Sequence, residues 1–278
     1  MGSVAVLDCA AGEWTSAVPL PSPRAWWGHS DGLVRLTDGA IVAVGGEDGL
    51  RTARAEVFRY DPVRQDWSEL APLVTARRRN SATVLADGRI LVAGGLTGPR
   101  EFPARGLASA ELYDPATGAW TSAGSMAEPR FFHHATLLPD GRVLLAGGST
   151  TRAGGYTMLE TAELYDPDSG LWTRTEHYDA DAGPRSLAEA KQVGRTGDRA
   201  LALAAGGVLV AGTGPKAALR VARAHFGVVE LTDGRVLVAG GVLVAGGVLV
   251  AGSGTAGEAI PAAGEFPLTA DAEIFRFA

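Results

Sequence analysis

The chain has 278 residues, 46% of them hydrophobic and 20% charged, which is typical of a globular protein able to bury a sizeable core. Its net charge of −6 provides no overall attraction for nucleic acid, so no nucleic-acid partner is expected. The one cysteine, Cys9, excludes an internal disulfide and a cysteine-based zinc site.

The N-terminal stretch MGSVAVLDCAAGEW has neither a basic segment nor a long apolar one. No signal peptide is therefore expected, and a cytoplasmic location is predicted. The candidate membrane segment is the apolar run 236–252, which reaches only the short limit for a spanning helix. Its glycine pairs and β-branched valines disfavour a helix, so no membrane association is expected.

Four segments of similar sequence end in a glycine pair: TDGAIVAVGG, ADGRILVAGG, PDGRVLLAGG and TDGRVLVAGG, at Gly46, Gly95, Gly148 and Gly241. The first three are each followed by Tyr-Asp-Pro, at 60–62, 113–115 and 165–167, and then by a tryptophan. Together with Trp14, the tryptophans Trp67, Trp120 and Trp172 are spaced 53, 53 and 52 residues apart. A fixed period near 50 residues is typical of a repeat architecture.

Each unit is expected to contain four short strands. An alternating first strand, such as 81–86, precedes an Asp-Gly hairpin turn, and an apolar second strand follows with both faces buried. The glycine pair supplies positive φ angles and allows close approach of neighbouring backbone. The third strand ends at Tyr-Asp-Pro, and the fourth carries the tryptophan, which can cover the outer seam between units.

The glycine pair, the tyrosine and the downstream tryptophan, in this order and spacing, resemble the kelch repeat of the galactose-oxidase-like superfamily. The resemblance is strong over 12–175, weak over 176–222 and partial over 223–278. It implies an all-β fold, a kelch-type β-propeller in which each unit is a four-stranded antiparallel blade around a central channel.

We expect one propeller domain spanning 1–278, with five blades, or six as the alternative. The second strands are predicted near Ile41, Ile90, Val143, Val208 and Val236. Residues 176–222 hold a degenerate blade without Tyr-Asp-Pro or tryptophan, and 242–258 are predicted to be a redundant repeat or loop. The C-terminal AEIFRFA matches a third strand and EWTSA at 13–17 a fourth, so both termini are expected to close one blade.

Up-and-down strand order places the loops between blades and the loops after the glycine pairs on one face, where arginine and aromatic residues gather. A positive face on an acidic chain suggests an anionic partner. The residues predicted to bind it are Arg24, Trp26, Trp27, Arg77, Arg78, Arg79, Arg100, Arg105, Arg130, Phe131, His133 and His225.

Two interpretations remain open for several of these. Arg77, Arg130 and Arg223 each precede an Asp-Gly turn by ten residues, so they either bond loop carbonyls between blades or contact a ligand. Arg78 and Arg79 lie outside the repeat pattern and, in an exposed loop, are better ligand candidates. The histidines at the blade entries show no metal-ligand spacing, so no metal or cofactor is expected.

The predicted function is non-catalytic binding of a protein or peptide, expected to be acidic, through the arginine- and aromatic-rich face of a monomer. The alternative is an enzyme or small-ligand binder with a pocket at the channel mouth, of the sugar-acid isomerase or lyase type. A third hypothesis is a defective or artificial repeat protein. No catalytic motif marks a reaction, and fold alone does not give function.

Overall fold

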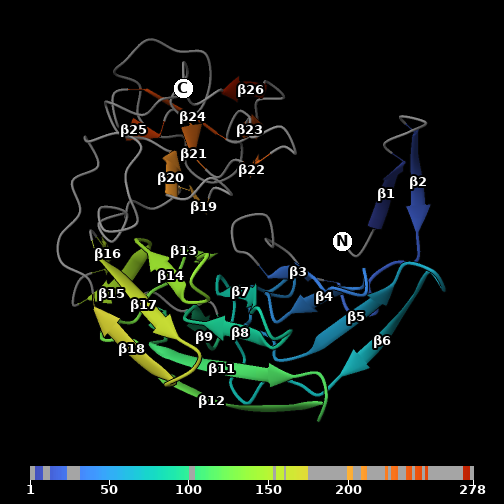
Figure 1. Cartoon of the computed structure of the whole chain (residues 1–278), viewed down its shortest axis with the longest axis horizontal. Coiled ribbons are helices and arrows are strands. Elements are labelled where there is room, and N and C mark those ends of the chain that lie inside the picture. The colour runs from blue at the N-terminus through green and yellow to red at the C-terminus, as the bar shows by residue number, and fades with distance from the viewer. Residues whose placement is uncertain are drawn as a thin grey trace. The chain divides into compact units, whose positions relative to one another are not determined.

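The protein is described by a computed structural model, in which every regular element of the described residues is a β-strand (Figure 1). The structure describes residues 4–8, 13–23, 32–99, 104–152, 155–159, 161–174, 199–202, 208–211, 223–224, 227–230, 236–239, 242–245, 248–249 and 272–275. No helix in these ranges is long and apolar enough to cross a membrane. The chain divides into two compact units, 1–131 with 150–157 and 132–149 with 158–278.

Unit 1 contains two four-stranded antiparallel blades. Blade 1 consists of β3 (Leu33–Arg35), β4 (Ile41–Val44), β5 (Val57–Asp61) and β6 (Asp66–Leu70), in that order. Blade 2 consists of β7 (Ser81–Val84), β8 (Ile90–Ala93), β11 (Ser109–Asp114) and β12 (Ala119–Ser125).

Three two-stranded ladders complete unit 1. They are β1 (Val4–Asp8) with β2 (Glu13–Ala17), β9 (Leu96–Thr97) with β10 (Arg105–Gly106), and β15 (Ser149–Arg152) with β16 (Gly155–Met158). The last two lie in the segments that follow the glycine pairs of the second and third repeats.

Unit 2 contains blade 3, formed by β13 (His134–Leu137), β14 (Val143–Ala146), β17 (Ala162–Asp166) and β18 (Leu171–Arg174). Its later strands are β19 (Arg199–Ala202), β20 (Val208–Ala211), β21 (Arg223–Ala224), β22 (Gly227–Glu230), β23 (Val236–Ala239), β24 (Val242–Ala245), β25 (Val248–Leu249) and β26 (Ala272–Phe275). They pair as β19-β20, β21-β24-β25 and β22-β23-β26.

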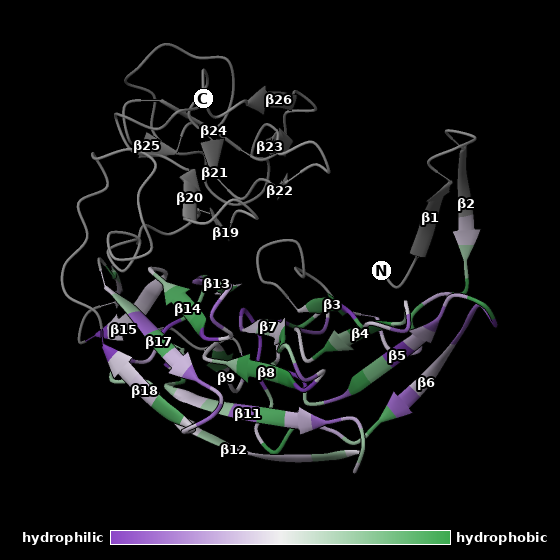
Figure 2. Cartoon of the chain, in the orientation of Figure 1, coloured by the Kyte–Doolittle hydropathy of each residue, from purple (hydrophilic) through white to green (hydrophobic). Residues whose placement is uncertain are grey.

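The five expected second strands are all present, as β4, β8, β14, β20 and β23, and each pairs antiparallel with a first strand. The expectation that second strands are buried on both faces is confirmed for β8 and β14, where every residue is buried. Figure 2 shows both in the green of hydrophobic sequence. The number of blades stays a prediction, and the copy at 242–249, expected to be redundant, forms strands β24 and β25.

Packing between blades 1 and 2 forms a continuous apolar core. Side chains of β4 and β8, including Val42, Val44, Ile90 and Val92, pack together with Leu73 of the connecting segment. Burying such branched side chains contributes about 1.5–3 kcal/mol each. This core fixes the connecting segment 71–80, which also supplies candidate site residues.

The first two glycine pairs each meet the carbonyl of a residue in the next connecting segment. The Gly46 amide donates to Arg77 O at 2.9 Å, and the Gly95 amide donates to Arg130 O at 2.8 Å. A Cβ at Gly45 would lie 2.5 Å from Arg77 O, and Gly45 and Gly46 both have positive φ, at 60° and 96°. The expected close backbone approach is therefore confirmed, and it leaves no space for a side chain.

The Asp-Gly hairpins have longer loops than a two-residue turn. In blade 1, the Leu36 amide donates to Ala40 O, and Gly39 has φ +87° while Asp38 does not have a positive φ. This matches a three-residue loop in which a type I turn is followed by a left-handed glycine. The Asp38 carboxylate accepts from the Ala40 amide at 2.9 Å and so fixes the turn.

The expected tryptophan seam is confirmed between blades 1 and 2. The Trp120 indole N–H donates to Ala71 O, which follows the last strand of blade 1, at 2.7 Å. Within blade 2 the Trp120 ring also packs against Tyr113, with ring centroids 5.0 Å apart. Trp67 makes the corresponding bond to Val18 O at 3.0 Å.

Only one of the two strands of the N-terminal hairpin was predicted from the sequence. Residues 13–17 were predicted to be a fourth strand, and no strand was predicted before them. In the structure β1 pairs with β2, with Leu7 opposite Trp14 and Asp8 opposite Glu13. Blade 2 has the same arrangement, with Tyr113 opposite Trp120. The hairpin β1–β2 is thus the third-and-fourth-strand half of a blade, and closure of one blade by both termini stays a prediction.

The glycine contact can be tested by replacing Gly45 with alanine. We expect Gly45→Ala to lower the free energy of unfolding by about 3 kcal/mol, because it combines left-handed strain with a collision against Arg77 O. Chemical denaturation followed by tryptophan fluorescence measures the change.

Gly88→Ala is the matched control, since Gly88 has φ +87° but a Cβ there would meet no atom within 4 Å. This variant has the backbone strain without the collision, so it should lower the free energy of unfolding by only about 1 kcal/mol. Equal losses in the two variants would show that the carbonyl contact contributes nothing.

Candidate partner-binding face

Several backbone hydrogen bonds bring three loop segments of unit 1 together. The Arg77 amide donates to Arg54 O, the Ala53 amide donates to Gly98 O, and Arg78 and Leu96 exchange amide–carbonyl bonds of 3.0 and 2.8 Å. Segments 45–54, 74–80, 96–99 and 104–107 therefore lie on one face of the unit, as strand order predicted. We call these segments, together with 150–152 and 155–157, the loop face.

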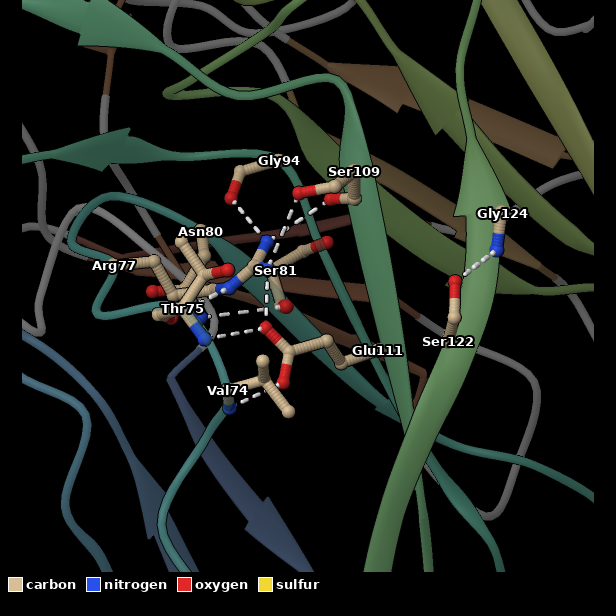
Figure 3. Close-up of polar contacts among 10 residues, drawn as sticks. All are labelled: Val74, Thr75, Arg77, Asn80, Ser81, Gly94, Ser109, Glu111, Ser122 and Gly124. Carbon is tan, nitrogen blue, oxygen red and sulfur yellow. Dashed lines mark hydrogen bonds and ion pairs between the residues drawn. The ribbon is translucent and has the colours of Figure 1, made fainter.

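Arg77 occupies the centre of the bonds that join the connecting segment between blades 1 and 2 to blade 2 (Figure 3). Its Nη1 donates to Gly94 O at 2.9 Å and to Ser109 O at 3.0 Å, and its Nη2 donates to Glu111 Oε1 at 2.6 Å. The side chain is fully buried. The first of the two interpretations is therefore confirmed for Arg77, which bonds loop carbonyls between blades and is not accessible to a partner.

Glu111 links the same guanidinium to the connecting segment. Its two carboxylate oxygens accept from the backbone amides of Val74, at 2.7 Å, and Thr75, at 3.1 Å. Burial lowers the pKa of Arg77, and the nearby Glu111 charge opposes that shift. The charged pair is thus retained in the interior because both partners are also hydrogen-bonded to backbone.

Arg78 differs from the expectation of an exposed loop residue. Only 3% of the residue is exposed, and its Nη1 lies 3.0 Å from Glu47 Oε2. Glu47 directly follows the glycine pair of blade 1 and is itself 1% exposed. The reason is local: the Arg78–Leu96 backbone bonds hold residue 78 against blade 2, so its side chain meets a carboxylate of blade 1.

Arg79 lies beside this pair and reaches solvent. Its Nε is 3.8 Å from Glu47 Oε2, and 19% of its side chain is exposed. Burial lowers the pKa of Arg79 most, with the Arg78 and Arg51 charges acting in the same direction and Glu47 opposing them. Arg79 and Arg51 both have left-handed φ, at 59° and 61°, a conformation that costs arginine about 1–3 kcal/mol and that clusters at functional sites.

An aromatic pair adjoins the arginines. Tyr156 of β16 contacts Phe131 edge-on with centroids 5.2 Å apart, and its hydroxyl accepts from the Ala104 amide at 3.3 Å. Tyr156 is 43% exposed, whereas Phe131 is 1% exposed. Tyr156 is thus the accessible aromatic residue of this pair. Sequence reasoning missed it because no repeated residue marks its position in β16.

The remaining predicted residues have varied positions. Arg105 is exposed on β10, whereas Arg130 and His133 are buried, at 0% and 3% exposure. Buried residues of this kind do not present a surface to a macromolecule. Five predicted residues lie outside the described residues: Arg24, Trp26, Trp27, Arg100 and His225. The described ranges contain no group of three or more histidine, cysteine or acidic residues placed to hold a metal ion.

The turns at the opposite ends of the strands are acidic, as expected, and their carboxylates accept hydrogen bonds from residues of the same turn. Asp61 accepts from the Val63 and Arg64 amides, and Asp140 accepts from the Arg142 guanidinium at 2.6 Å. Backbone and side-chain bonds of this kind lower the pKa of Asp38, where the Ala40 amide contributes first and Arg59 second. On this side Arg59, Arg89 and Arg142 are each paired with a nearby carboxylate.

The four-stranded antiparallel sheets recur about every 50 residues, and hydrogen bonds from loop residues and tryptophans join one sheet to the next. Such sheets are the blades of a β-propeller. Residues 33–74 and 77–127 match the Kelch motif. Two kelch motifs thus lie within residues 33–127, and kelch-repeat proteins are among those to which the chain is similar.

Similar proteins include an F-box/kelch-repeat protein of Arabidopsis thaliana, 30% identical over 60% of this chain and 42% of its own length. Kelch-like protein 34 of Homo sapiens is 31% identical over 62% of this chain and 27% of its own length. This chain spans less than half the length of these relatives. The solved structure of YjhT matches with a TM-score of 0.64 and 14% identity, covering 98% of this chain and 88% of that one, and supports the fold.

We expect removal of the buried guanidinium to destabilise the fold strongly. Arg77→Met leaves Glu111 charged and buried without its partner, so it should cost about 3–5 kcal/mol in the free energy of unfolding. Arg152→Met is the control, because Arg152 is 59% exposed in its pair with Glu128 and should cost less than about 1 kcal/mol. Comparable losses in urea denaturation would contradict the assigned role of Arg77.

The acidic turns predict a pH dependence of stability. The pKa of Asp38 and the pKa of Asp140 are both lowered in the folded state, the latter first by the Arg142 side chain. Their stabilisation is present above the ordinary value of 3.8 and is lost as pH falls through the lower folded value. Between pH 7 and 3, the melting temperature should fall less in Asp38→Asn/Asp140→Asn than in the wild type; parallel profiles would contradict this.

Proposed function

We propose that the chain is a non-catalytic kelch propeller that binds an acidic protein or peptide through its loop face. The observation that carries this proposal is the grouping of Arg51, Arg79 and Tyr156, contributed by three different loop segments. Arginine and tyrosine are enriched at the energetic centres of protein interfaces.

Electrostatics supports an acidic partner for this face. The charges of Arg78 and Arg51 both lower the pKa of Arg79, and Glu47 lies 3.0 Å from Arg78 Nη1 and 3.8 Å from Arg79 Nε. A partner carboxylate would meet several guanidinium groups in surroundings that are partly desolvated, where charge-assisted hydrogen bonds are strongest.

Sequence relatives support the general class of function. Proteins named as kelch-like and as F-box/kelch-repeat combine this module with other sequence, since this chain matches only part of their length. A module used as one part of a larger protein suits a binding role. The identity of the partner and the monomeric state expected from the sequence belong to this proposal.

Affinity capture with the whole chain as bait tests the proposal. The loop-face variant is Arg79→Ala/Arg105→Ala, and the matched control is Arg89→Ala/Arg142→Ala on the acidic turns. Both variants lose two positive charges, so their net charge is identical. Proteins retained by the wild type and the control, but lost from the loop-face variant and at high salt, would support the proposal.

A defined probe tests the chemistry of the partner separately. A fluorescent peptide alternating glutamate and glycine should bind the wild type more tightly than its glutamine counterpart, measured by anisotropy at low salt. The loop-face variant should lose at least about tenfold in affinity, which corresponds to roughly 1.4 kcal/mol. Equal loss in the two double variants would indicate unspecific charge attraction and contradict a loop-face site.

A further inference from the structure

The loop that follows the first glycine pair is fixed by hydrogen bonds within it. Glu47 and Ala53 form an antiparallel bridge at its base, and the Asp48 amide donates to Thr52 O at 3.1 Å. The Asp48 carboxylate oxygen Oδ1 accepts from the amides of Leu50 and Thr52, each at 2.9 Å. An aspartate that binds the amides of nearby residues in this way stabilises a tight turn. The tip of the loop is therefore ordered before any partner binds.

Leu50 lies at the tip of this loop and extends an aliphatic side chain into solvent. The residue is 81% exposed, and a Cβ at the neighbouring Gly49 would meet no atom within 4 Å. Asp48 binds the backbone of residue 50 and not its side chain, so a polar residue at this position would fold equally well. Leu50 thus presents apolar surface that the fold itself does not use.

Single exposed apolar residues are common on protein surfaces, but Leu50 directly precedes Arg51 of the proposed binding site. Burial lowers the pKa of Arg79 most, and the Arg51 charge lowers it further, whereas Tyr156 has the opposite effect. Charged groups influence one another only over short distances where solvent screens them, so Arg51 and Tyr156 both lie near the Arg79 guanidinium. Three segments therefore place aliphatic, cationic and aromatic groups together on the loop face.

This combination of groups defines the chemistry of a matching ligand. A carboxylate can bind at Arg51 and Arg79, but an acidic side chain alone would leave Leu50 in water. An apolar side chain packed on Leu50 would bury its surface and reduce the access of water to the adjacent ion pairs. In an extended segment, side chains two positions apart point the same way and lie roughly 6.6 Å apart. An acidic and an apolar residue with this spacing can therefore contact neighbouring residues of the loop face at the same time.

We propose that Leu50 is a specificity contact, and that the loop face selects an acidic segment carrying an aliphatic residue two positions from a glutamate or aspartate. Asp48 is the positioning residue that holds Leu50 in place for this contact. The inference rests on the proposed function, because the acidic side chain has to bind at Arg51 and Arg79. It adds a requirement that charge alone does not impose, since an equally acidic segment without the aliphatic residue binds more weakly.

Two fluorescent peptides of equal charge test the contact by anisotropy at low salt. Both alternate glutamate and glycine, with the central glutamate replaced by serine in one peptide and by leucine in the other. The leucine peptide should bind the wild type about fivefold more tightly than the serine peptide. In Leu50→Ser this gain should disappear, while the affinity for the serine peptide stays the same. Val63→Ser is the matched control, because Val63 is 90% exposed on an acidic turn at the opposite ends of the strands, and it should keep the gain.

The positioning role of Asp48 is tested by two substitutions that remove the same charge. Asp48→Asn retains an oxygen that can accept from the amides of Leu50 and Thr52, whereas Asp48→Ala does not. The leucine gain should persist in Asp48→Asn and be lost in Asp48→Ala, with peptide mass spectrometry confirming that the introduced amide is intact. Circular dichroism checks that both variants fold like the wild type. Equal gains in the two variants would contradict the positioning role.

The outcomes distinguish this inference from the proposed function. Suppose that both peptides bind the wild type and are lost from Arg79→Ala/Arg105→Ala. If leucine then adds no affinity, or its gain persists in Leu50→Ser, the specificity contact is overturned while the acidic binding site stands. A gain lost equally in Val63→Ser would also overturn it, as a sign of unspecific apolar adhesion. If neither peptide binds the wild type, the proposed function is wrong and the inference falls with it.

Discussion

The contact between a glycine pair and the carbonyl of the next connecting segment is the constraint on which the structure depends. Gly46 donates its amide to Arg77 O, and a Cβ on the neighbouring Gly45 would collide with that oxygen. The same backbone segment that satisfies the glycines also directs the Arg77 guanidinium into the interior, where Gly94, Ser109 and Glu111 receive it. One backbone position therefore sets both the spacing of adjacent blades and the burial of a charge.

This constraint separates the arginines into two groups. Arg77 is held inside, and Arg78, one position on, is bonded to Leu96 and buried against Glu47. At Arg79 the chain adopts a left-handed conformation, and its side chain is partly exposed beside Tyr156. Three consecutive arginines thus have three different environments, and the accessible one is the residue whose backbone is strained. The proposed binding surface is therefore narrower than the arginine-rich face that composition suggested.

Much of the fold was predictable because its determinants are local and repeated. The glycine pairs mark the ends of the second strands, and the Asp-Gly sequences mark the acidic turns. The tryptophans, such as Trp120, mark the seam between blades. All three recur at a fixed period. The site was less predictable because exposure is a tertiary property. No local signal distinguishes Arg78 from Arg79, and no repeated residue marks the position of Tyr156. The strand at Val4–Asp8 was missed because Leu7 replaces the tyrosine that marks a third strand.

The tryptophan seam has a direction. In the two bonds of Trp120 with Ala71 and Trp67 with Val18, the indole N–H belongs to the later repeat and the accepting carbonyl to the segment before it. A carbonyl that loses its partner can accept from water more readily than a partly enclosed indole can find a new acceptor. Loss of an earlier segment should therefore harm the next repeat more than loss of a later one harms its predecessor. Each repeat therefore depends more on the repeat before it than on the repeat after it. Removing residues from the N-terminal end should destabilise the remaining repeats more than removing them from the C-terminal end.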